Sequence, residues 1–571
     1  MKTWKTNLEE TNQRYINWWN HKGIILSMWE HFQEGVKPHA DIAPPAPARD
    51  LSQKWFDPQW RAEYLDWYVA HSSLMADMLP VANTQLGPGS LAAILGGVFE
   101  GGEDTIWIHP DPNFNDEIVF NPEHPNWLLH KELLKACKAK ANGNYFVGMP
   151  DLMEGLDVLA ALKGTDMVLL DTVMQPEVLE QQMQQINDIY FKVFDELYDI
   201  IREGDEMAFC YFSSWAPGKM SKLQSDISTM ISQDDYRRFV QPFIREQCQK
   251  IDYTLYHLDG VGAMHHLPAL LEIEELNAIQ WTPGVGEPQG GSPKWYDLYK
   301  KILAGGKSVM ACWVTLEELK PLLDHIGADG VHLEMDFHNE REVEQAMRII
   351  EEYTGSSSSV SADVHTNQPV GEQDNAQESI RIREEKSQEE DRMKPLYDAI
   401  VAGKLEPAVE VTKDAIAAGV LPQDIINGYM ITAMGEVGQR FQDGKAFVPQ
   451  LLMAGRAMKG ALELLKPLLA GNASATIGKI VIGTVKGDLH DIGKNLVASM
   501  LEGCGFEVIN IGIDVTCDKF VEAVKENKAD ILCMSALLTT TMTYMQDVIR
   551  ALEEAGIRDQ VKVMIGGGIC R

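Results

Sequence analysis

The segment that most constrains the fold of this chain is residues 487–495, Gly-Asp-Leu-His-Asp-Ile-Gly-Lys-Asn. The run before it, 479–485, is apolar and rich in β-branched residues, whereas the apolar spacing in 496–501 suits a helix. The segment is therefore predicted to be a loop between a buried strand and a helix. Loops of this kind bind ligands at the carboxyl edge of parallel sheets.

Two side chains in this loop are spaced for metal binding. An imidazole can bind a metal through one ring nitrogen while a carboxylate two positions earlier holds the other nitrogen, and Asp488 and His490 have that spacing. Gly493 would let a bulky ligand approach the backbone. The pattern Asp-x-His-x-x-Gly resembles the signature of cobalamin-binding modules of the methionine synthase and methanogenic corrinoid-protein kind. The resemblance implies that His490 replaces the nucleotide base beneath the cobalt of cobalamin or a related corrinoid.

Two later segments extend the resemblance. The apolar strand 531–534 runs into Ser535 and Leu537, which resemble the family's Ser-x-Leu and are followed by the hydroxyl residues Thr539 and Thr541. By this resemblance Ser535 would hydrogen-bond the displaced base and Leu537 would line its tunnel. The alternative is a nucleotide-like α/β domain with glycine turns that serve packing only.

The last domain is predicted as repeated strand, loop and helix over residues 472–571, a Rossmann-like (flavodoxin-like) cobalamin-binding domain. Its strand 561–565 ends in Gly566, Gly567 and a third glycine, where missing side chains leave room for the nucleotide tail. Related modules continue beyond the point that corresponds to Arg571 with another strand and helix. Either the sequence is cut there or the protein lacks this strand and helix. Whether the domain retains the nucleotide tail of the cofactor depends on which of the two holds.

Composition excludes several classes of function. A chain of 571 residues is too long for one ordinary core, so two to four domains are expected. The formal net charge of −34 argues against binding to a nucleic-acid backbone. The eight cysteines include no Cys-x-x-Cys pair, which indicates a reducing compartment and no disulfide framework. With no apolar run that could span a bilayer, we predict no membrane partner and a cytoplasmic location.

In the first 354 residues, short apolar runs alternate with longer helical patterns. This alternation predicts a largely parallel sheet, and about eight such units suit a (β/α)₈ TIM barrel with its active site at the carboxyl ends of the strands. The predicted strands are 24–28, 145–148, 207–212, 253–258, 278–281, 308–312 and 330–333.

The predicted strand ends carry the motifs that identify a second resemblance. The motifs are His257-Leu258-Asp259-Gly260, Trp281-Thr282-Pro283-Gly284, Cys312-Trp313, His332-Leu333-Glu334-Met335-Asp336, Gln85-Leu86-Gly87-Pro88-Gly89 and Ser213-Ser214-Trp215-Ala216-Pro217-Gly218. Together they resemble the uroporphyrinogen decarboxylase superfamily, which includes decarboxylases and cobamide-dependent methyltransferases.

The chain departs from both branches of that superfamily. The arginine-rich segment with which the decarboxylases grip propionate groups is absent. The thiol-methylating branch binds zinc through His-x-Cys and a distant cysteine, where this chain has His257, Asp259 and Glu334. This nitrogen and oxygen set can still hold zinc. The alternative is a metal-free site in which Asp259 and Glu334 bind substrate or cap the backbone, and Cys312 is either a ligand or a small buried hydrophobe.

Four tryptophans near predicted strand ends have two interpretations. Indole faces attract aromatic rings and cationic methyl groups, so these residues could line a substrate pocket. They could equally be packing residues of the barrel. They are Trp29, Trp281, Trp295 and Trp313.

Between the two halves, the composition of residues 355–391 predicts a flexible linker, because the segment is rich in Ser, Gln and Glu and nearly free of large apolar residues. Four helical patterns follow in 392–471, with Met430, Met434 and Val437 as a stripe at helical spacing. Before a cobalamin-type domain, such a bundle resembles the helical cap that covers the upper face of the corrin.

Together these features predict a corrinoid-dependent methyltransferase that moves a methyl group from a small O-, N- or S-methyl donor to the cobalt of its own corrinoid domain. One alternative is transfer from methylcobamide to a thiol or a folate, and a second is a corrinoid-binding sensor. The expected partners are the small methylated substrate, a separate acceptor methyltransferase and a corrinoid-reactivating protein.

Overall fold

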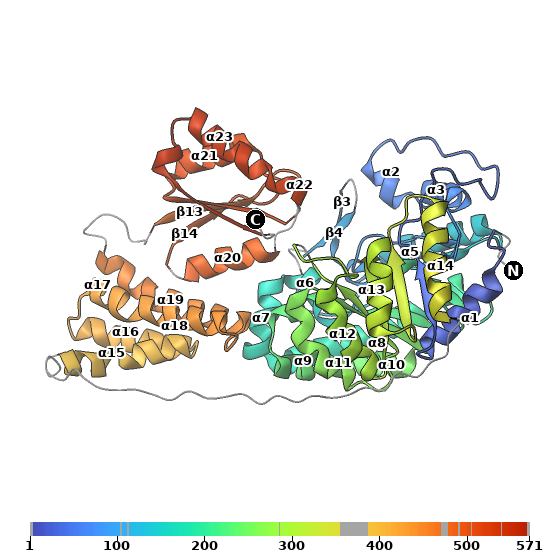
Figure 1. The fold of residues 1–571 in the computed structure, drawn as a ribbon. Helices are drawn as coiled ribbons and strands as arrows, with labels where there is room; N and C mark the ends of the chain where they lie inside the picture. Colours follow the sequence, from blue (N-terminus) through green and yellow to red (C-terminus); the bar gives the residue numbers. More distant parts are fainter. Residues whose placement is uncertain are drawn as a thin grey trace. The chain divides into compact units, whose positions relative to one another are not determined.

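The computed structural model describes residues 4–102, 105–110, 114–284, 286–354, 386–469, 478–488, 492–503, 505–537 and 539–567. The chain forms two compact units, Met1–Ser356 and Ser357–Arg571 (Figure 1). None of the helices in these described ranges combines the length and the apolar character needed to cross a membrane.

The larger sheet of the amino-terminal unit has six parallel strands in the order β1-β12-β11-β10-β9-β8. The first strand of the unit therefore pairs with the last one, although almost the whole unit separates them in sequence. The strands are β1 (Ile24–Ser27), β8 (Met220–Leu223), β9 (Tyr253–Asp259), β10 (Ala278–Thr282), β11 (Ser308–Val314) and β12 (Val331–Met335).

A second sheet has the order β2-β5-β6-β7. Its strands are β2 (Val81–Ala82), β5 (Phe146–Met149), β6 (Met207–Phe209) and β7 (Ser214–Ala216), and only β7 runs antiparallel to its neighbour. A hairpin of β3 (Val98–Gly101) and β4 (Ile106–His109) stands apart. The α/β class with parallel strands is confirmed. The strand pairs of the described residues do not include one between β1 and β2, so the closed barrel stays a prediction.

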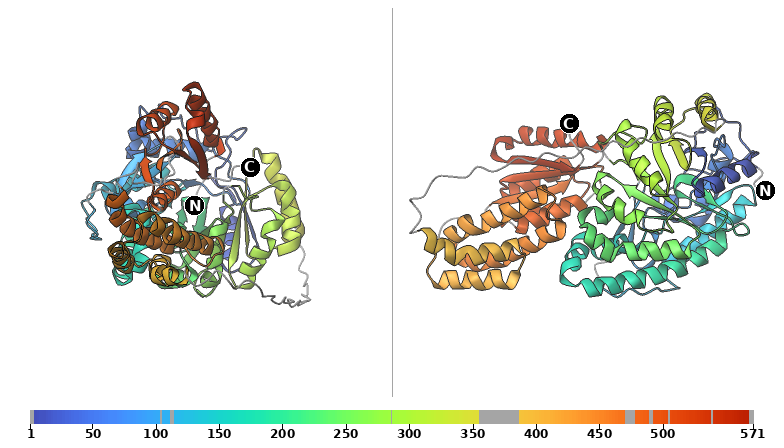
Figure 2. Two further views of the ribbon diagram at one scale, coloured as in Figure 1. Left: turned by 90° about the vertical axis from the view of Figure 1, so that its left-hand side faces the viewer. Right: turned by 60° about the horizontal axis from the view of Figure 1, so that its bottom comes forward.

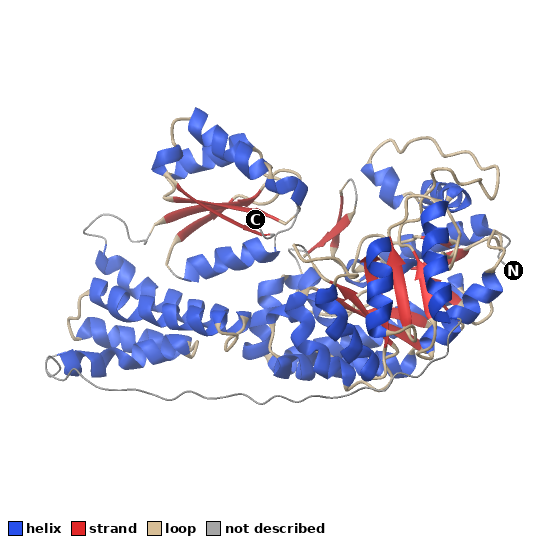
Figure 3. Cartoon of the chain, viewed as in Figure 1, coloured by secondary structure: helices blue, strands red, loops and turns tan. Residues whose placement is uncertain are grey.

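Helices alternate with these strands and lie outside them (Figure 3). They are α1 (Leu8–Trp19), α2 (Leu51–Phe56), α3 (Pro58–His71), α4 (Ser90–Ile94), α5 (Pro125–Ala141), α6 (Gly155–Lys163), α7 (Thr165–Met174), α8 (Pro176–Ile201), α9 (Gln233–Phe239), α10 (Gln241–Lys250), α11 (Leu267–Leu271), α12 (Tyr296–Ala304), α13 (Leu316–Ile326) and α14 (Glu340–Thr354). The helix boundary between α9 and α10 falls just before Pro242, whose missing N–H suits the first turn of a helix.

All seven predicted strands of this unit are present in the structure, because each is a buried apolar run. The sequence interpretation missed β8, which is buried throughout but carries the polar residues Ser221 and Lys222. Because the run has only four residues and two of them are polar, it lacks the apolar pattern by which a strand is predicted from sequence. That hidden strand matters, because the loop after it contributes to the site described below.

The carboxyl-terminal unit begins, within the described residues, with a bundle of helices that run side by side in Figure 2 (right, yellow to orange). They are α15 (Lys386–Val401), α16 (Leu405–Ala417), α17 (Pro422–Ile425), α18 (Ile431–Gln442) and α19 (Val448–Leu469), with the π-helical turn η5 (Ile426–Met430) before α18. Met430 and Val437 are buried and Met434 packs against them, so the predicted stripe is core. Residues 355–385 of the predicted linker lie outside the described residues, and α15 starts at Lys386.

A four-stranded parallel sheet in the order β14-β13-β15-β16 completes this unit. Its strands are β13 (Lys479–Thr484), β14 (Glu507–Asn510), β15 (Ile531–Ala536) and β16 (Lys562–Gly567), all of which were predicted. Helix α20 (Ile492–Gly503) covers one face, and α21 (Cys517–Asn527) and α23 (Tyr544–Glu554) cover the other, with the short α22 (Thr539–Met542) after β15 (Figure 1). This is the predicted Rossmann-like arrangement. Helix α19 packs against α20, where Leu451 and Met500 share a core cluster.

Candidate functional sites

Two carboxylates and one imidazole meet at the carboxyl ends of β8 and β9. One ligand atom each from Asp226, His257 and Asp259 can lie within 4.8 Å of the others. His257 and Asp259 are among the last three residues of β9, and Asp226 starts the 3₁₀ helix η2 (Asp226–Met230) after β8. The structure thus brings together two of the predicted residues and adds Asp226, which the sequence interpretation missed.

The environment of His257 prepares it to act as a ligand. Its Nδ1 contacts the side-chain oxygen of Gln280, its cross-strand partner on β10, so Nδ1 carries the proton and Nε2 offers a lone pair. Burial, with a contribution from the positive charge of Lys222, lowers the pKa of His257 to about 3. The ring is therefore neutral at neutral pH, as metal binding requires.

Glu334 lies at the far end of a hydrogen-bond chain that starts at His257. The side-chain amide of Gln280 donates to Cys312 Sγ (3.0 Å), and Cys312 Sγ donates to Glu334 Oε2 (2.9 Å). Glu334 Oε1 is buried and has no hydrogen-bond partner among the described residues. Glu334 is therefore not a member of the possible metal-binding group of Asp226, His257 and Asp259. Cys312 links Gln280 to Glu334 through hydrogen bonds, so it is not a simple buried hydrophobe.

A buried lysine organises the carboxylates beside this group. Lys222 Nζ pairs with Asp151 (2.6 Å) and also contacts the side-chain oxygen of Gln224. Gln224 in turn donates from its backbone to Glu154 (3.1 Å) and from its side chain to Asp226 (3.0 Å). The backbone N–H of Asp226 donates to Asp157 (2.8 Å). The network fixes the loop after β8, and hence the position of Asp226.

Carboxylates outnumber the cations around Lys222, and their raised pKa values show that burial and mutual repulsion disfavour their charged forms. Burial raises the pKa of Asp157 to about 6 and raises the pKa of Glu154 strongly. Part of Asp226 remains open to solvent, yet its pKa is also raised, first by desolvation and then by Asp157 and Asp259. Burial raises the pKa of Asp259 as well. A bound cation would relieve this repulsion, and nitrogen with carboxylate oxygen is an ordinary zinc ligand set.

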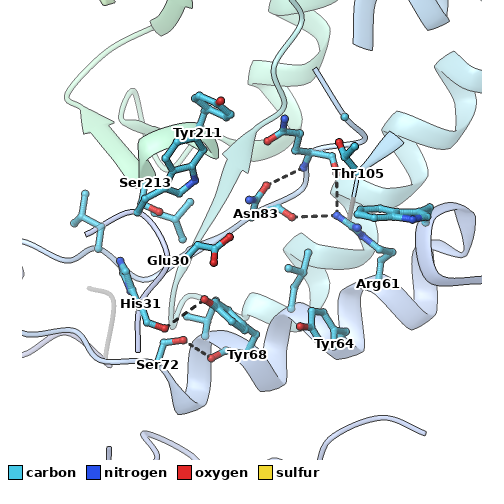
Figure 4. Close-up of a pocket in the computed structure, with 18 of the residues that line it drawn as sticks. Glu30, His31, Arg61, Tyr64, Tyr68, Ser72, Asn83, Thr105, Tyr211 and Ser213 are labelled. Carbon is cyan, nitrogen blue, oxygen red and sulfur yellow. Dashed lines mark hydrogen bonds between the residues drawn. The ribbon is translucent and has the colours of Figure 1, made fainter. Parts of the chain in front are cut away.

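A cavity of about 560 Å³ lies beside Tyr211 and Ser213, which follow β6 (Figure 4). Its wall includes Glu30 after β1, Asn83 and Gln85 after β2, and Tyr211 after β6, so it too lies at the carboxyl ends of strands. The ring of Tyr211 also lies 6.2 Å from the ring of His257. Tyr211 is thus shared by the cavity and the His257 group.

The backbone is strained where the cavity meets that group. Phe212, Ser213 and Trp313 all have positive φ values, of 59°, 43° and 55°. Bulky residues rarely adopt this conformation, and such strain persists mainly at functional sites. Trp29 packs against Tyr211 (4.4 Å between ring centroids) and stacks on Trp313 (6.1 Å).

The four tryptophans therefore divide between the two interpretations. Trp29 lines the cavity and Trp313 stacks on it. Trp281 and Trp295 are fully buried and pack against each other with 5.0 Å between centroids, which makes them core residues.

In the carboxyl-terminal unit, Asp488 is buried in the loop that follows β13, at the carboxyl edge of the sheet. Its Oδ2 accepts hydrogen bonds from the backbone N–H of Leu537 (2.7 Å) and from Thr541 Oγ1 (2.7 Å). Asp488 therefore ties its own loop to the segment after β15. His490 lies outside the described residues, as does the side chain of Thr539.

The other predicted cofactor residues surround this point. Ser535 and Leu537 are half-buried at the end of β15. A side chain at Gly493 or Gly566 would meet open space, which fits an adjacent bulky ligand. Gly567 differs, because its φ is +120° and a Cβ there would lie 1.9 Å from the carbonyl oxygen of Ala536. Its missing side chain is required for strand packing, and its contact with the nucleotide tail stays a prediction.

Comparisons with known proteins agree with this second site. Residues 478–571 match a family model described as B12 binding domain, and residues 393–466 match a second model with the same description. The trimethylamine corrinoid protein 1 of Methanosarcina acetivorans is 46% identical over 172 residues, which cover 30% of this chain and 80% of the relative. The dimethylamine corrinoid protein of Methanosarcina barkeri is 44% identical over 179 residues, 31% of this chain and 84% of the relative.

Among solved structures, the methanol:cobalamin methyltransferase complex from Methanosarcina barkeri is 32% identical, with 34% of this chain and 76% of that chain covered and a TM-score of 0.29.

Proposed function

This chain belongs to the corrinoid-protein family through its carboxyl-terminal residues, and from that membership we propose that it is a corrinoid-dependent methyltransferase with its methyl-donor site in the same chain. The donor is a small molecule with a methyl group on oxygen, nitrogen or sulfur. The observation that carries the proposal is the group of Asp226, His257 and Asp259 at the carboxyl ends of parallel strands, in a chain that also has a corrinoid-binding region.

The amino-terminal unit is proposed to be a (β/α)₈ barrel of the uroporphyrinogen decarboxylase superfamily. The parallel pairing of β1 with β12 supports this, because closing a barrel requires the first and last strands to meet. The site residues and the cavity wall all follow strand ends, as expected for such a barrel.

At the donor site, Asp226, His257 and Asp259 would hold a zinc ion. When bound, zinc would supply a Lewis acid for the heteroatom that loses the methyl group. In the metal-free alternative, the chain itself supplies the proton. The carboxyl of Glu334, whose pKa burial raises to about 7, is partly protonated near neutral pH and could supply the proton to the leaving group. Asp259, whose pKa burial also raises, is the second candidate.

At the corrinoid site, His490 would be the lower cobalt ligand and Asp488 its carboxylate partner. When bound, the corrinoid supplies a cobalt centre that accepts the methyl group and passes it on. Asp488, through Leu537 and Thr541, holds the loop at the sheet edge. The half-buried Ser535 and the open space at Gly566 suit the displaced base and the nucleotide tail. A separate acceptor methyltransferase and a reactivating protein would complete the cycle.

The test is methyl transfer by the full chain reconstituted with reduced cobalamin. A panel of methoxyaromatics, methylamines and methyl thioethers is offered, and methylation is followed by the visible spectrum of the cobalamin. We expect at least one class to react, and His257→Ala to stop the reaction. If no donor reacts, or if His257→Ala, Asp259→Ala and Asp226→Ala all react like the wild type, the proposed donor site is wrong. Ligand-dependent corrinoid binding without transfer would favour the sensor.

A further inference from the structure

Arg61 is a buried arginine in the wall of the cavity (Figure 4). It reaches from α3 to the loop after β2, where its Nη2 donates to the backbone oxygens of Asn83 (3.2 Å) and Gln85 (3.0 Å). Only 7% of the residue is exposed, and its Nε is buried without a hydrogen-bond partner. Within the described ranges, no carboxylate forms an ion pair with it.

A buried guanidinium without a counter-ion is costly to keep charged. Carbonyl groups satisfy only one of its nitrogens, although the group has five N–H donors. The ring of Trp55 lies 5.1 Å from the Arg61 carbon and contributes a cation–π contact, but it supplies no negative charge. A buried charge needs a partner, and the forked guanidinium can bind a carboxylate through two parallel hydrogen bonds.

The rest of the wall indicates what such a carboxylate is attached to. Five aromatic residues line the cavity, namely Trp29, Trp55, Tyr64, Tyr68 and Tyr211. The cavity volume of about 560 Å³ lies within the range of small-molecule sites. Tyr211 borders the His257 group, so a ligand that spans the cavity can place one end at Arg61 and the other near the ligating residues.

We propose that this cavity binds a methyl donor that carries a carboxylate, with Arg61 pairing with the carboxylate and the aromatic wall enclosing the methyl-bearing part. This inference rests on the proposed function and narrows its substrate class. Two kinds of compound share this chemistry: a methoxybenzoate and a carboxylated trimethylammonium. Glu30 is exposed in the same wall and would favour the second kind through its negative charge.

The test is a binding measurement on the full chain without corrinoid, so that it does not depend on turnover. Two matched pairs of probes are titrated calorimetrically: 4-methoxybenzoate against methoxybenzene, and glycine betaine against tetramethylammonium. In at least one pair we expect the carboxylated probe to bind about 10-fold or more tighter, as a charge-assisted pair implies. Equal affinity within both pairs would overturn the proposal.

Variants assign the preference to Arg61. Arg61→Met should remove it, and Arg61→Lys should keep a part, because an ammonium retains the charge but loses the fork. The control is Arg49→Met, an exposed arginine whose side chain bonds only to Gln53 among the described residues and which should bind like the wild type. If Arg61→Met keeps the preference, the proposal is wrong. Because Arg61 also holds the loop after β2, the folding of each variant is checked by circular dichroism. If Arg61→Met does not fold, the binding preference of Arg61→Lys is the deciding measurement.

Glu30→Gln separates the two kinds of compound. Loss of betaine binding in Glu30→Gln identifies the trimethylammonium class. Arg61-dependent binding of methoxybenzoate that Glu30→Gln does not weaken, with no betaine binding by the wild type, identifies the methoxybenzoate class. The two proposals also fail differently. If carboxylated probes bind through Arg61 but no methyl group is transferred, only the proposed function is wrong. If neutral donors are demethylated equally well by the wild type and Arg61→Met, only this inference is wrong.

Discussion

The thiol of Cys312 donates a hydrogen bond of 2.9 Å to the carboxylate of Glu334. The two residues are cross-strand partners on β11 and β12, and both are buried. Burial raises the pKa of Glu334 to about 7, and burial together with the nearby carboxylate raises the pKa of Cys312. The pair is therefore a neutral thiol beside a carboxyl group that titrates near neutral pH.

This pair makes stability depend on pH. The pKa of Glu334 is higher in the folded state than the ordinary 4.5, so its stabilising contribution is complete below about pH 4.5 and is lost as the pH rises through 7. Glu334→Gln should remove this dependence, so that the variant gains roughly 3 kcal/mol relative to the wild type between pH 4.5 and pH 8. Denaturant unfolding across this range measures it. Glu340→Gln, at an exposed position, is the control, and a pH-independent difference would contradict the prediction.

Metal analysis tests the composition of the donor site. We expect near-stoichiometric zinc in the wild type and its loss in Asp226→Ala and His257→Ala, because both residues belong to the ligating group. Glu334→Gln should keep the metal, since Glu334 is linked to His257 only through Gln280 and Cys312. If Glu334→Gln loses the metal and Asp226→Ala keeps it, the ligands are His257, Asp259 and Glu334, as predicted from the sequence. Active protein without metal would favour the proton-transfer alternative.

The buried pair of Lys222 and Asp151 should be important for folding. Lys222→Met leaves the carboxylate of Asp151 buried without its partner, which costs about 3–5 kcal/mol. The double variant Lys222→Met/Asp151→Leu should recover part of the loss. Lys219→Met breaks an exposed pair with Asp195 of similar length (2.7 Å), and should cost less than about 1 kcal/mol. Similar losses for the two lysine variants would show that burial does not decide the effect.

Cobalamin spectra test the corrinoid site. His490→Gly should leave the protein folded and change the visible spectrum of bound cobalamin to a form without a protein nitrogen on cobalt. Asp488→Asn should act in the same direction more mildly, with about a 10- to 100-fold weaker affinity, because the Asp488 carboxylate holds its loop through Leu537 and Thr541. An unchanged spectrum in His490→Gly would refute the assignment of the ligand.

The two adjacent glycines at the end of β16 should respond differently to substitution. Gly567→Ala forces a side chain into the carbonyl of Ala536 at a positive φ, so it should destabilise the domain by more than about 2 kcal/mol. Gly566→Ala meets open space and should leave stability nearly unchanged, while weakening cobalamin binding if the nucleotide tail lies there. Thermal unfolding and a cobalamin titration read the two effects separately. Equal destabilisation by both substitutions would contradict the packing argument.

Local pattern was enough to predict most of the strands and the loop that carries Asp488, although β2, β3, β4, β7 and β8 were not among the strands predicted. In the amino-terminal unit each predicted strand is a buried apolar run, as burial of both faces of a parallel sheet requires. In the carboxyl-terminal unit β13 and β15 are mostly buried, whereas β14 is partly exposed and β16 is largely exposed. Local pattern also predicted the burial of Met430 and Val437, which lie at helical spacing in two core clusters that Met434 contacts. These features depend on neighbours in sequence, so sequence alone determined them.

The tertiary structure alone decided the membership of the donor site. Asp226 and Lys222 sit on or after a short polar strand with no motif, and Arg61 is an ordinary helix residue in the sequence. They become a candidate metal ligand, the ion-pair partner of Asp151 and a cation in the cavity wall because parallel strands bring their carboxyl ends to one edge, where loops distant in sequence meet. Glu334 was predicted as a ligand but lies outside the group of Asp226, His257 and Asp259. Its position at the end of the hydrogen-bond chain from His257 through Gln280 and Cys312 follows from strand register, which no local sequence pattern encodes.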